Sequence, residues 1–306
     1  MRTLGKNKQS TLVQAQTTPI QLEFEGNELT FLLDQGAAIT HLTFASAPHA
    51  EILKPQPDYH FESSLLFPFP NRLANGVYEF EGKTYRFDLN DFGLPNALHG
   101  LVADKLFTLT SQGSDHSKAW ATAQLINTGD QSSFPFPFGL EVTYTLSNQS
   151  LSIAFKVTNQ GDGNMPFGLG WHPYFNLGQH ISNCALKLPV CREIEIDENM
   201  IPNGKKSPST CFDSYRSLVG LTLDTCFEIT DIGKENSTFV KLNDIQVLEI
   251  WQDENHAYVQ VFTPADGNTI AIEPMTCGID ALNTGEGIQV LAPGASMTMR
   301  CGVRLV

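Results

Sequence analysis

The sequence predicts an all-β protein, built as one large antiparallel β-sandwich or barrel. Apolar and polar residues alternate with a period of two along many short segments, and turn residues separate those segments. The composition agrees, because 20 Phe, 24 Gly and 17 Pro residues favour strands and tight turns. No segment carries the apolar stripe of a sustained amphipathic helix.

The alternation is clearest where two such segments flank a short turn. Each of these places predicts a β-hairpin, since antiparallel neighbours are joined by tight turns. The three predicted hairpins are residues 22–31 with a turn at Gly26–Asn27, residues 78–87 with a turn at 81–83, and residues 142–157 with a turn at 147–150.

Further strands are expected in the second half of the chain, at residues 247–251, 258–262, 270–273 and 297–306. Residues 134–138 read Phe-Pro-Phe-Pro-Phe. Two prolines remove backbone donors from a sheet, so this run is expected to be a loop or an edge rather than a central strand.

Nothing in the sequence divides the chain. It contains no Gly/Ser-rich linker, no block of like charge and no fixed-period repeat. Apolar residues make up 41%, which is enough for a large core. We therefore expect residues 1–306 to form a single domain, with residues 1–18 as a loosely packed lead-in.

The charge balance limits the partners. The chain has 33 acidic and 19 basic residues, a formal net charge of −14. Such a surface repels nucleic acid and anionic membranes, and a neutral small molecule fits it better. The basic N-terminus is followed by no apolar run, and no stretch approaches the ~18 apolar residues of a membrane span. Six scattered cysteines fit reduced thiols, so we expect a cytoplasmic protein.

Glu273 is a candidate general base within the apolar run of residues 269–273. Alternation puts Ala271 and Glu273 on one face of the strand. The pattern alone favours a solvent-facing glutamate at a strand end. However, residues 274–278 are expected to end the strand beside the carboxylate, where a binding cleft can open. Apolar surroundings there would raise the pKa of Glu273 and make it a better base.

His172 is the matching candidate acid, in Gly-Trp-His-Pro-Tyr-Phe-Asn-Leu at residues 170–177. A lone histidine is more often packed in a core with a hydrogen bond to the backbone. Here Trp171, Tyr174 and Phe175 are residue types that stack on the apolar face of a sugar ring, and Asn176 offers an amide. The segment therefore predicts a carbohydrate site, at which an imidazole and a carboxylate can move one proton onto a substrate and another off.

Arg72 follows Phe-Pro-Phe-Pro-Asn at residues 67–71, and the prolines predict a stiff, extended backbone. One interpretation is a surface salt bridge. The other is a guanidinium held rigidly enough to grip two neighbouring hydroxyl groups. His99 precedes Gly100 in a turn, where a local hydrogen bond would explain it equally well.

Asp224 and Gln260 are polar residues in otherwise apolar segments. Asp224 fits a turn, and Gln260 alternates against Val259 and Val261, so it points to the same side as other polar groups. Sequence signatures of other chemistries fail: there is no dinucleotide or phosphate loop, no nucleophile elbow and no zinc-hydrolase motif.

Taken together, six ordered segments from about residue 20 to the C-terminus resemble the aldose 1-epimerase (galactose mutarotase) family. The resemblance implies the large antiparallel galactose mutarotase-like supersandwich fold and an isomerase that interconverts the α and β anomers of a hexose such as glucose or galactose. The six segments are residues 67–76 (Phe-Pro-Phe-Pro-Asn-Arg-Leu-Ala-Asn-Gly), 96–100 (Asn-Ala-Leu-His-Gly), 170–177, 223–227, 258–264 and 270–278.

The same resemblance assigns a role to each candidate residue. Glu273 would take the proton from the anomeric hydroxyl, and His172 would protonate the ring oxygen as the ring opens. His99 would hydrogen-bond near the ring oxygen and share the acid's work. The remaining hydroxyls would be held by Asn71, Arg72, Asp224 and Gln260. Since only protons move in this reaction, the resemblance implies neither a metal nor an organic cofactor.

Other functions stay open at this point. A hexose-6-phosphate 1-epimerase would want several basic residues near the cleft, and the motifs offer mainly Arg72. A non-catalytic carbohydrate-binding protein or sensor would not need both Glu273 and His172. A glycoside-processing enzyme would typically need two carboxylates. The sequence leaves open which aldose is used and whether the protein is a monomer or a homodimer.

Overall fold

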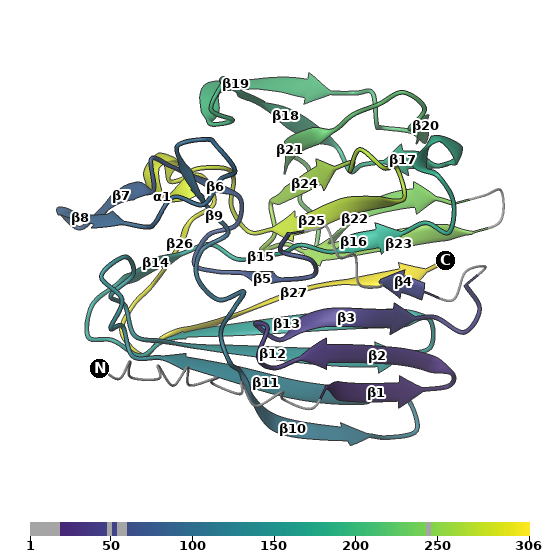
Figure 1. The fold of residues 1–306 in the computed structure, drawn as a ribbon, viewed down its shortest axis with the longest axis horizontal. Coiled ribbons are helices and arrows are strands. Elements are labelled where there is room, and N and C mark those ends of the chain that lie inside the picture. Colours follow the sequence, from purple (N-terminus) through teal and green to yellow (C-terminus); the bar gives the residue numbers. More distant parts are fainter. Residues whose placement is uncertain (1–18, 48–50, 54–59, 243–245) are drawn as a thin grey trace, which may run out of the picture.

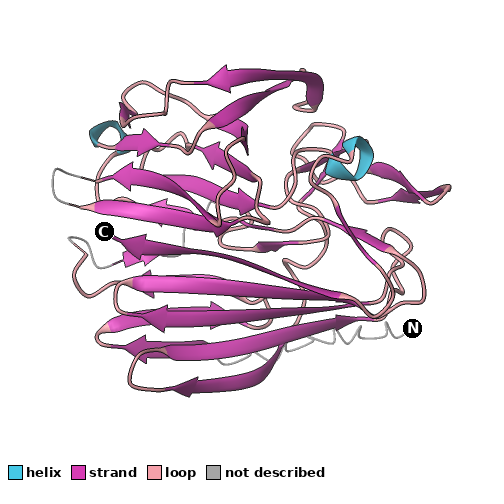
Figure 2. Ribbon diagram, turned by 180° about the vertical axis from the view of Figure 1, so that it is seen from behind, coloured by secondary structure: helices cyan, strands magenta, loops and turns pink. Residues whose placement is uncertain are grey.

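A computed structural model describes residues 19–47, 51–53, 60–242 and 246–306 of the chain. Strands dominate these residues, and their helical segments are only one 3₁₀ turn, η1 (Ile181–Asn183), and one short helix, α1 (Ala281–Thr284) (Figures 1 and 2). Within the described ranges no helix is long and apolar enough to cross a bilayer. The lead-in expected over residues 1–18 lies outside the described residues.

The largest element is a nine-stranded sheet that runs through most of the molecule (Figure 1). All its strand pairs are antiparallel. In spatial order its strands are β10 (Thr108–Ser114), β11 (Ala119–Asn127), β12 (Phe138–Ser147), β13 (Ser150–Asn159), β27 (Ser296–Leu305), β23 (Val247–Asp253), β22 (Glu235–Lys241), β17 (Ala185–Lys187) and β20 (Arg216–Ser217).

A four-stranded sheet packs against one end of this sheet, toward the bottom of Figure 1. The rings of Phe31 and Tyr144 lie 4.8 Å apart between the two layers. The Tyr144 hydroxyl donates a 2.6 Å hydrogen bond to the Ala37 carbonyl, which satisfies its buried polar end. The four strands are β1 (Ile20–Phe24), β2 (Asn27–Leu32), β3 (Ala38–Thr43) and β4 (Glu51–Leu53).

An eight-stranded sheet lies toward the top of Figure 1, and its strand β25 contacts β23 of the nine-stranded sheet. This sheet carries most of the candidate residues. Its strands are, in order, β19 (Pro202–Ser209), β18 (Cys191–Ile196), β21 (Asp224–Ile229), β24 (Tyr258–Phe262), β25 (Thr269–Met275), β15 (Gly170–Trp171) and β5 (Leu65–Leu66), with β16 (Tyr174–Asn176) also paired to β25.

Three two-stranded ribbons complete the fold, and one of them, β6 with β9, borders the candidate residues. The ribbons are β6 (Arg72–Ala74) with β9 (Asn96–Leu98), β7 (Val77–Phe80) with β8 (Lys83–Arg86), and β14 (Met165–Phe167) with β26 (Gln289–Leu291).

The three predicted hairpins are confirmed, with small shifts at two of the turns. The first turn is Glu25–Gly26 rather than Gly26–Asn27, since Phe24 pairs directly with Asn27. Both turn residues have positive φ, at 49° and 78°, which suits the twist of a two-residue hairpin. The second hairpin turns at Glu81–Gly82 in the same conformation, and the third pairs Ser147 with Ser150.

Residues 134–137 form a loop as expected, but Phe138 begins the central strand β12. The proline run therefore stops at the point where both neighbouring strands begin to pair. The expectation that residues 274–278 end the strand is confirmed, because β25 ends at Met275, two residues beyond Glu273. Every residue of β25 is buried.

The run before Asn71 is anchored in the core. Phe67 and Phe69 are buried, and the Phe67 ring lies 4.6 Å from that of Phe138. Burying one such ring contributes about 1.5–3 kcal/mol, so the backbone entering the candidate site is firmly held. Gly100 crosses directly over Phe67, and a Cβ atom there would collide with the Phe67 carbonyl. Only glycine fits this close approach.

Candidate active site

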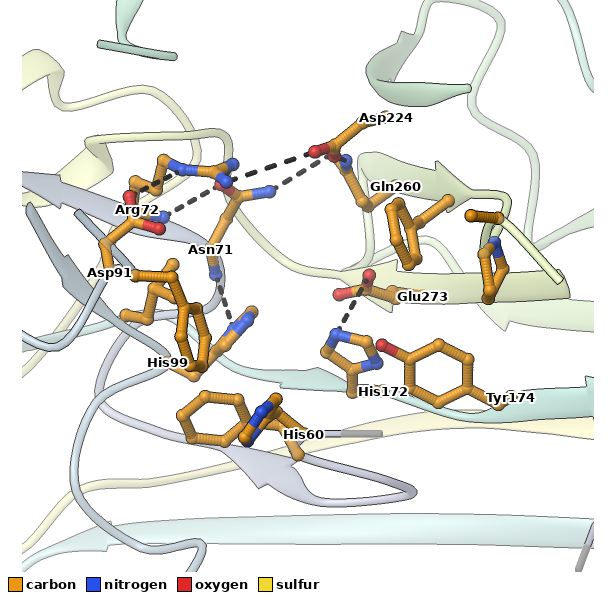
Figure 3. A pocket seen from close by; sticks show the side chains of 16 residues that line it. His60, Asn71, Arg72, Asp91, His99, His172, Tyr174, Asp224, Gln260 and Glu273 are labelled. Carbon is orange, nitrogen blue, oxygen red and sulfur yellow. Dashed lines mark hydrogen bonds and ion pairs between the residues drawn. The ribbon is translucent and has the colours of Figure 1, made fainter. Parts of the chain in front are cut away.

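A cavity of about 340 Å³ opens above the eight-stranded sheet. All seven residues proposed from the sequence line it, although up to 202 positions separate them along the chain (Figure 3). The sheet contributes Glu273 from β25, Gln260 from β24 and Asp224 from the start of β21. His172 lies between β15 and β16. The β6–β9 ribbon places Asn71, Arg72 and His99 on the other side.

Strand register explains how the sheet presents its polar side chains. Gln260 pairs directly with Glu273 across the β24–β25 ladder, so both project from the same face. Glu273 is only 2% exposed, which overturns the solvent-facing interpretation. The strand ends two residues later, at Met275, and Glu273 points from this fully buried strand into the cavity.

His172 and Glu273 meet inside this cavity. The His172 Nε2 atom lies 3.4 Å from Glu273 Oε1, and both side chains are buried. Glu273 Oε2 and His172 Nδ1 are buried with no hydrogen-bond partner among the described residues. Native structures rarely leave such atoms unpaired, and both residues line the cavity, where a group from outside the protein can supply the missing partner.

Burial shifts both groups toward their uncharged forms. It raises the pKa of the Glu273 carboxyl well above its ordinary value, a shift that Asp224 increases and Arg72 opposes. It also lowers the pKa of His172 to about 4. Both shifts favour a pair that holds a single proton between its two members, and the short separation lets that proton reside on either partner. Such a pair can accept one proton and supply another.

His99 faces the same pair from the ribbon. Its ring lies 5.1 Å from that of His172, and burial lowers its pKa well below the ordinary value, with His172 and Arg72 adding to the effect. The backbone N–H of Asn71 donates to His99 Nδ1 at 3.1 Å. Because Nδ1 accepts, the neutral ring carries its hydrogen on Nε2, which is a donor. Asn71 and His99 both have positive φ, 57° and 61°.

Arg72 is held by a carboxylate that the sequence did not indicate. Its Nε donates to Asp91 Oδ2 at 2.9 Å, and Asp91 is almost fully buried. Asn96 donates to the same oxygen at 2.8 Å. The predicted salt bridge thus exists, but it is buried in the site rather than at the surface. It orients the guanidinium toward Asp224, whose Oδ2 lies 4.0 Å away.

A hydrogen-bonded row continues from Arg72 across the site. Asn71 Nδ2 donates to Gln260 Oε1 at 3.1 Å, and Gln260 Nε2 donates to Asp224 Oδ1 at 2.6 Å. Burial raises the pKa of Asp224, against the opposing effects of Arg72 and Gln260. The row offers both donors and acceptors, which is what several adjacent hydroxyl groups require.

Part of the aromatic prediction was wrong. Trp171 and Phe175 are completely buried, and their rings pack edge to face in the hydrophobic core. Neither lines the cavity. Tyr174 does line it, and it stacks on His172 with ring centroids 4.9 Å apart. Side chains alternate along an extended chain, so His172 and Tyr174 face the cavity whereas Trp171 and Phe175 face the core.

Asn176 was also expected to offer a hydrogen bond to a ligand. Its Nδ2 instead donates to the Glu51 carbonyl at 2.8 Å, joining β16 to the four-stranded sheet. Sequence reasoning missed further cavity residues besides Asp91, among them the aromatic side chains His60, Phe61, Phe92 and Phe262. Only Phe262 gave a usable signal, since it lies two residues from Gln260 on the same strand. Across the described ranges, no group of three or more His, Cys, Asp and Glu side chains is arranged to hold a metal ion.

Comparisons with known proteins agree with this geometry. The family profile described as aldose 1-epimerase matches residues 20–304. The uncharacterized protein YihR of Escherichia coli K12 is 26% identical over 271 residues, covering 85% of this chain and 84% of that protein. The galactose mutarotase of Sus scrofa is 30% identical over 154 residues, which span 47% of this chain and 42% of that enzyme.

Solved structures share the fold. A galactose mutarotase-like protein from Clostridium acetobutylicum superposes with a TM-score of 0.84 at 21% identity, covering 94% of this chain and 95% of the other. The galactose 1-epimerase of Lactobacillus acidophilus NCFM gives 0.79 at 16% identity, with 94% of each chain covered. The profile match over nearly the whole length, on this fold, shows that the chain belongs to the aldose 1-epimerase family.

Proposed function

We propose that this protein is an aldose 1-epimerase that interconverts the α and β anomers of a neutral hexose such as glucose or galactose. The observation that carries the proposal is the buried His172–Glu273 pair, which holds one proton at the bottom of a cavity lined by hydroxyl-binding groups. Anomer exchange requires one proton to leave the anomeric hydroxyl and another to reach the ring oxygen, which matches what this pair can do.

Ring opening begins with the shared proton on His172. Glu273 takes the proton of the anomeric hydroxyl, the bond between C1 and the ring oxygen breaks, and His172 protonates that oxygen. The result is an open-chain aldehyde, a neutral Glu273 and a neutral His172. Burial favours these uncharged forms, so the environment assists the opening step.

Ring closure uses the same groups in reverse. After rotation about the C1–C2 bond, neutral His172 takes the proton from the hydroxyl that becomes the ring oxygen. Glu273 returns its proton to the new anomeric oxygen. His99, a donor through Nε2, hydrogen-bonds near the ring oxygen, and the row from Arg72 to Gln260 holds the other hydroxyls.

The charges of the cavity favour a neutral sugar over a sugar phosphate. Its lining contains one cationic side chain that is always charged, Arg72, and three carboxyl groups, at Asp91, Asp224 and Glu273. Arg72 is already engaged by Asp91 at 2.9 Å. A phosphate group needs several unengaged donors or cations, and the lining residues do not provide them.

The proposal is tested by polarimetry of freshly dissolved α-D-glucose and α-D-galactose at neutral pH, with and without the protein. We expect faster relaxation to the same final rotation with at least one sugar, and loss of the acceleration in a Glu273→Gln variant. Binding by calorimetry without acceleration would contradict the proposal and indicate a carbohydrate-binding protein or sensor instead.

A further inference from the structure

The nine-stranded sheet has a face that the proposed chemistry does not use. Along most of β11, β12 and β13 every second residue is buried in the core, and the residues between them are partly accessible. The four-stranded sheet packs on the buried side of these strands, and Figure 2 looks onto the opposite side. We call this partly accessible side of the nine-stranded sheet the outer face.

One row of residues crosses the outer face from β11 to β22. Each residue of the row pairs directly with the next across an antiparallel ladder, so all six belong to the same face. Two of them are tryptophans, which stand four strand spacings apart, or about 19 Å. Two hydroxyl side chains and a glycine lie between them. In spatial order the row is Trp120, Thr145, Ser152, Gly302, Trp251 and Ser237.

Both tryptophans lie flat on a glycine of the neighbouring strand. Trp120 pairs with Gly113, where an added Cβ atom would meet three atoms of the Trp120 ring at 2.7, 3.1 and 3.2 Å. A Cβ atom on Gly302 would meet Nε1 and Cε2 of Trp251 at 2.7 and 2.8 Å. Several atoms of each ring thus rest on the glycine, so one ring face lies on the sheet and the other faces outward. Both side chains are partly accessible.

The row itself carries no charged side chain. Arg304, in the next row, is engaged by both oxygens of Glu249 at 2.6 and 2.8 Å. On the other side of the row, the hydroxyls of Thr122 and Thr143 lie 2.9 Å apart and bond to each other. Lys118, at the end of the row, is exposed and lies 5.8 Å from the Trp120 ring centre. The row is therefore flat, uncharged and bordered by groups that can hydrogen-bond.

This pattern fits a chain of sugar rings better than a protein partner. A pyranose ring has an apolar C–H face, which stacks on a flat aromatic face, and hydroxyl groups at its edge, which serine and threonine can bind. Two such aromatic faces about 19 Å apart can contact separate rings of one extended chain. A second copy of this chain fits poorly, since each copy carries a net charge of −14 and serine and threonine are depleted or neutral at stable apolar interfaces.

We propose that the outer face binds an extended, uncharged polysaccharide along the row from Trp120 to Trp251. This site is separate from the cavity, because neither tryptophan lines it. It holds several sugar rings without reacting with them. The proposal does not depend on the epimerase activity, but the two are compatible: a protein held on a polysaccharide lies where breakdown of that polymer releases free aldoses.

The test is native gel electrophoresis in gels that contain amylopectin, mixed-linkage β-glucan, galactan or galactomannan. Each polymer is first reduced with borohydride, so that it offers no anomeric carbon to the cavity. We expect at least one polymer to retard the wild-type protein. Trp120→Ala and Trp251→Ala should each raise the Kd for that polymer about tenfold, because the two rings act together on one chain.

Conservative and blocking variants sharpen the test. Trp120→Phe and Trp251→Phe keep an aromatic face and should raise the Kd by less than about threefold. Thr145→Lys leaves both rings on their glycines but puts a long charged side chain across the row, so it should abolish retardation even if an alanine variant fails to fold. Val290→Ala is the control. Val290 is 53% exposed on β26, outside both the row and the cavity, so its removal should leave the Kd unchanged.

Four results would overturn the proposal. None of the four polymers retards the wild-type protein, or retardation survives both Trp120→Ala and Thr145→Lys. Retardation that disappears in high salt would indicate attraction between charges rather than stacking on a neutral chain. A wild-type dimer in light scattering that becomes monomeric in Trp251→Ala would show that the outer face joins two copies of the chain.

Discussion

Two pairs of a histidine and a carboxylate are buried in the described part of the chain, and their surroundings differ. His256 and Asp253 lie 2.8 Å apart at the end of β23, and the backbone N–H groups of Asn255 and Arg300 also donate to Asp253. His172 and Glu273 lie 3.4 Å apart in the cavity, and one Glu273 oxygen has no partner within the described part of the chain.

The two carboxyl groups therefore respond differently to burial. Burial opposes ionisation of both, but the hydrogen bonds from His256, Asn255 and Arg300 lower the pKa of Asp253 overall. Glu273 receives no such donors, and its pKa rises well above the ordinary value. A satisfied carboxylate stabilises the fold, whereas an unsatisfied one keeps a proton to exchange. The difference lies in the number of donors rather than in residue type.

The largest expected effect is on catalytic activity, and it distinguishes Glu273 from Asp253. Glu273→Gln keeps the shape but removes the base, so catalysed anomer exchange should fall about 10³–10⁴-fold. Asp253→Asn should leave kcat within about threefold, because this pair does not line the cavity. Exchange rates measured by polarimetry on folded protein check both variants. Similar losses of exchange rate in the two variants would show that the two carboxyl groups do not differ in function.

Replacing the two histidines should also affect kcat unequally, with a smaller difference than for the carboxyl groups. His172→Gln removes the acid, and kcat should fall about 10²–10³-fold while His99 supplies part of the proton transfer. His256→Gln should leave kcat nearly unchanged. Sugar binding by calorimetry should persist in His172→Gln. Lost binding with normal turnover of the remaining complex would mean that His172 only positions the sugar.

A third comparison concerns carboxylates that hold cations. Asp91 is buried and fixes Arg72, whereas Asp104 is 81% exposed and pairs with Lys105. Asp91→Asn should raise KM about tenfold, with a smaller change in kcat, because the guanidinium loses its orienting charge. Asp104→Asn should have no measurable effect, as expected for an exposed pair. Equal effects in steady-state kinetics would refute the positioning role of Asp91.

Stability should show the smallest effect, and its sign should be opposite for the two pairs. The raised pKa of Glu273 means that its proton-linked stability is complete below about pH 4.5 and is lost as pH rises toward the folded-state pKa. Glu273→Gln lacks this loss, so its Tm should exceed that of the wild type by a few degrees at neutral pH, with the difference vanishing in acid.

Asp253→Asn should instead destabilise the protein by about 1–3 kcal/mol, since an amide nitrogen cannot accept the buried backbone hydrogen bonds. Thermal melts of the two variants across the same pH range check both signs. A lower Tm for Glu273→Gln at neutral pH would show that the carboxyl stabilises the fold, contrary to the contrast drawn between the pairs.

The sequence predicted the strands and hairpins well because turn residues and period-two alternation are local signals. It also identified seven residues that meet in the cavity.

The sequence could not predict Asp91, because that residue lies in a loop whose contact with Arg72 exists only after the ribbon β6–β9 forms. It assigned Trp171 and Phe175 to the sugar because composition does not reveal which side of the chain faces the core. The burial of Glu273 likewise depends on a second layer covering β25, which no local pattern records.

The pH dependence of kcat/KM for the preferred sugar tests the shared-proton pair most directly, after subtraction of the uncatalysed rate. We predict a plateau across neutral pH, an acid limb near pH 4 where His172 takes a second proton, and an alkaline limb where Glu273 loses the last one. Asp224→Asn should move the alkaline limb to lower pH, because it removes a charge that raises the pKa of Glu273. An acid limb at the ordinary histidine value of about 6.5, or an alkaline limb unmoved by Asp224→Asn, would contradict the coupled pair.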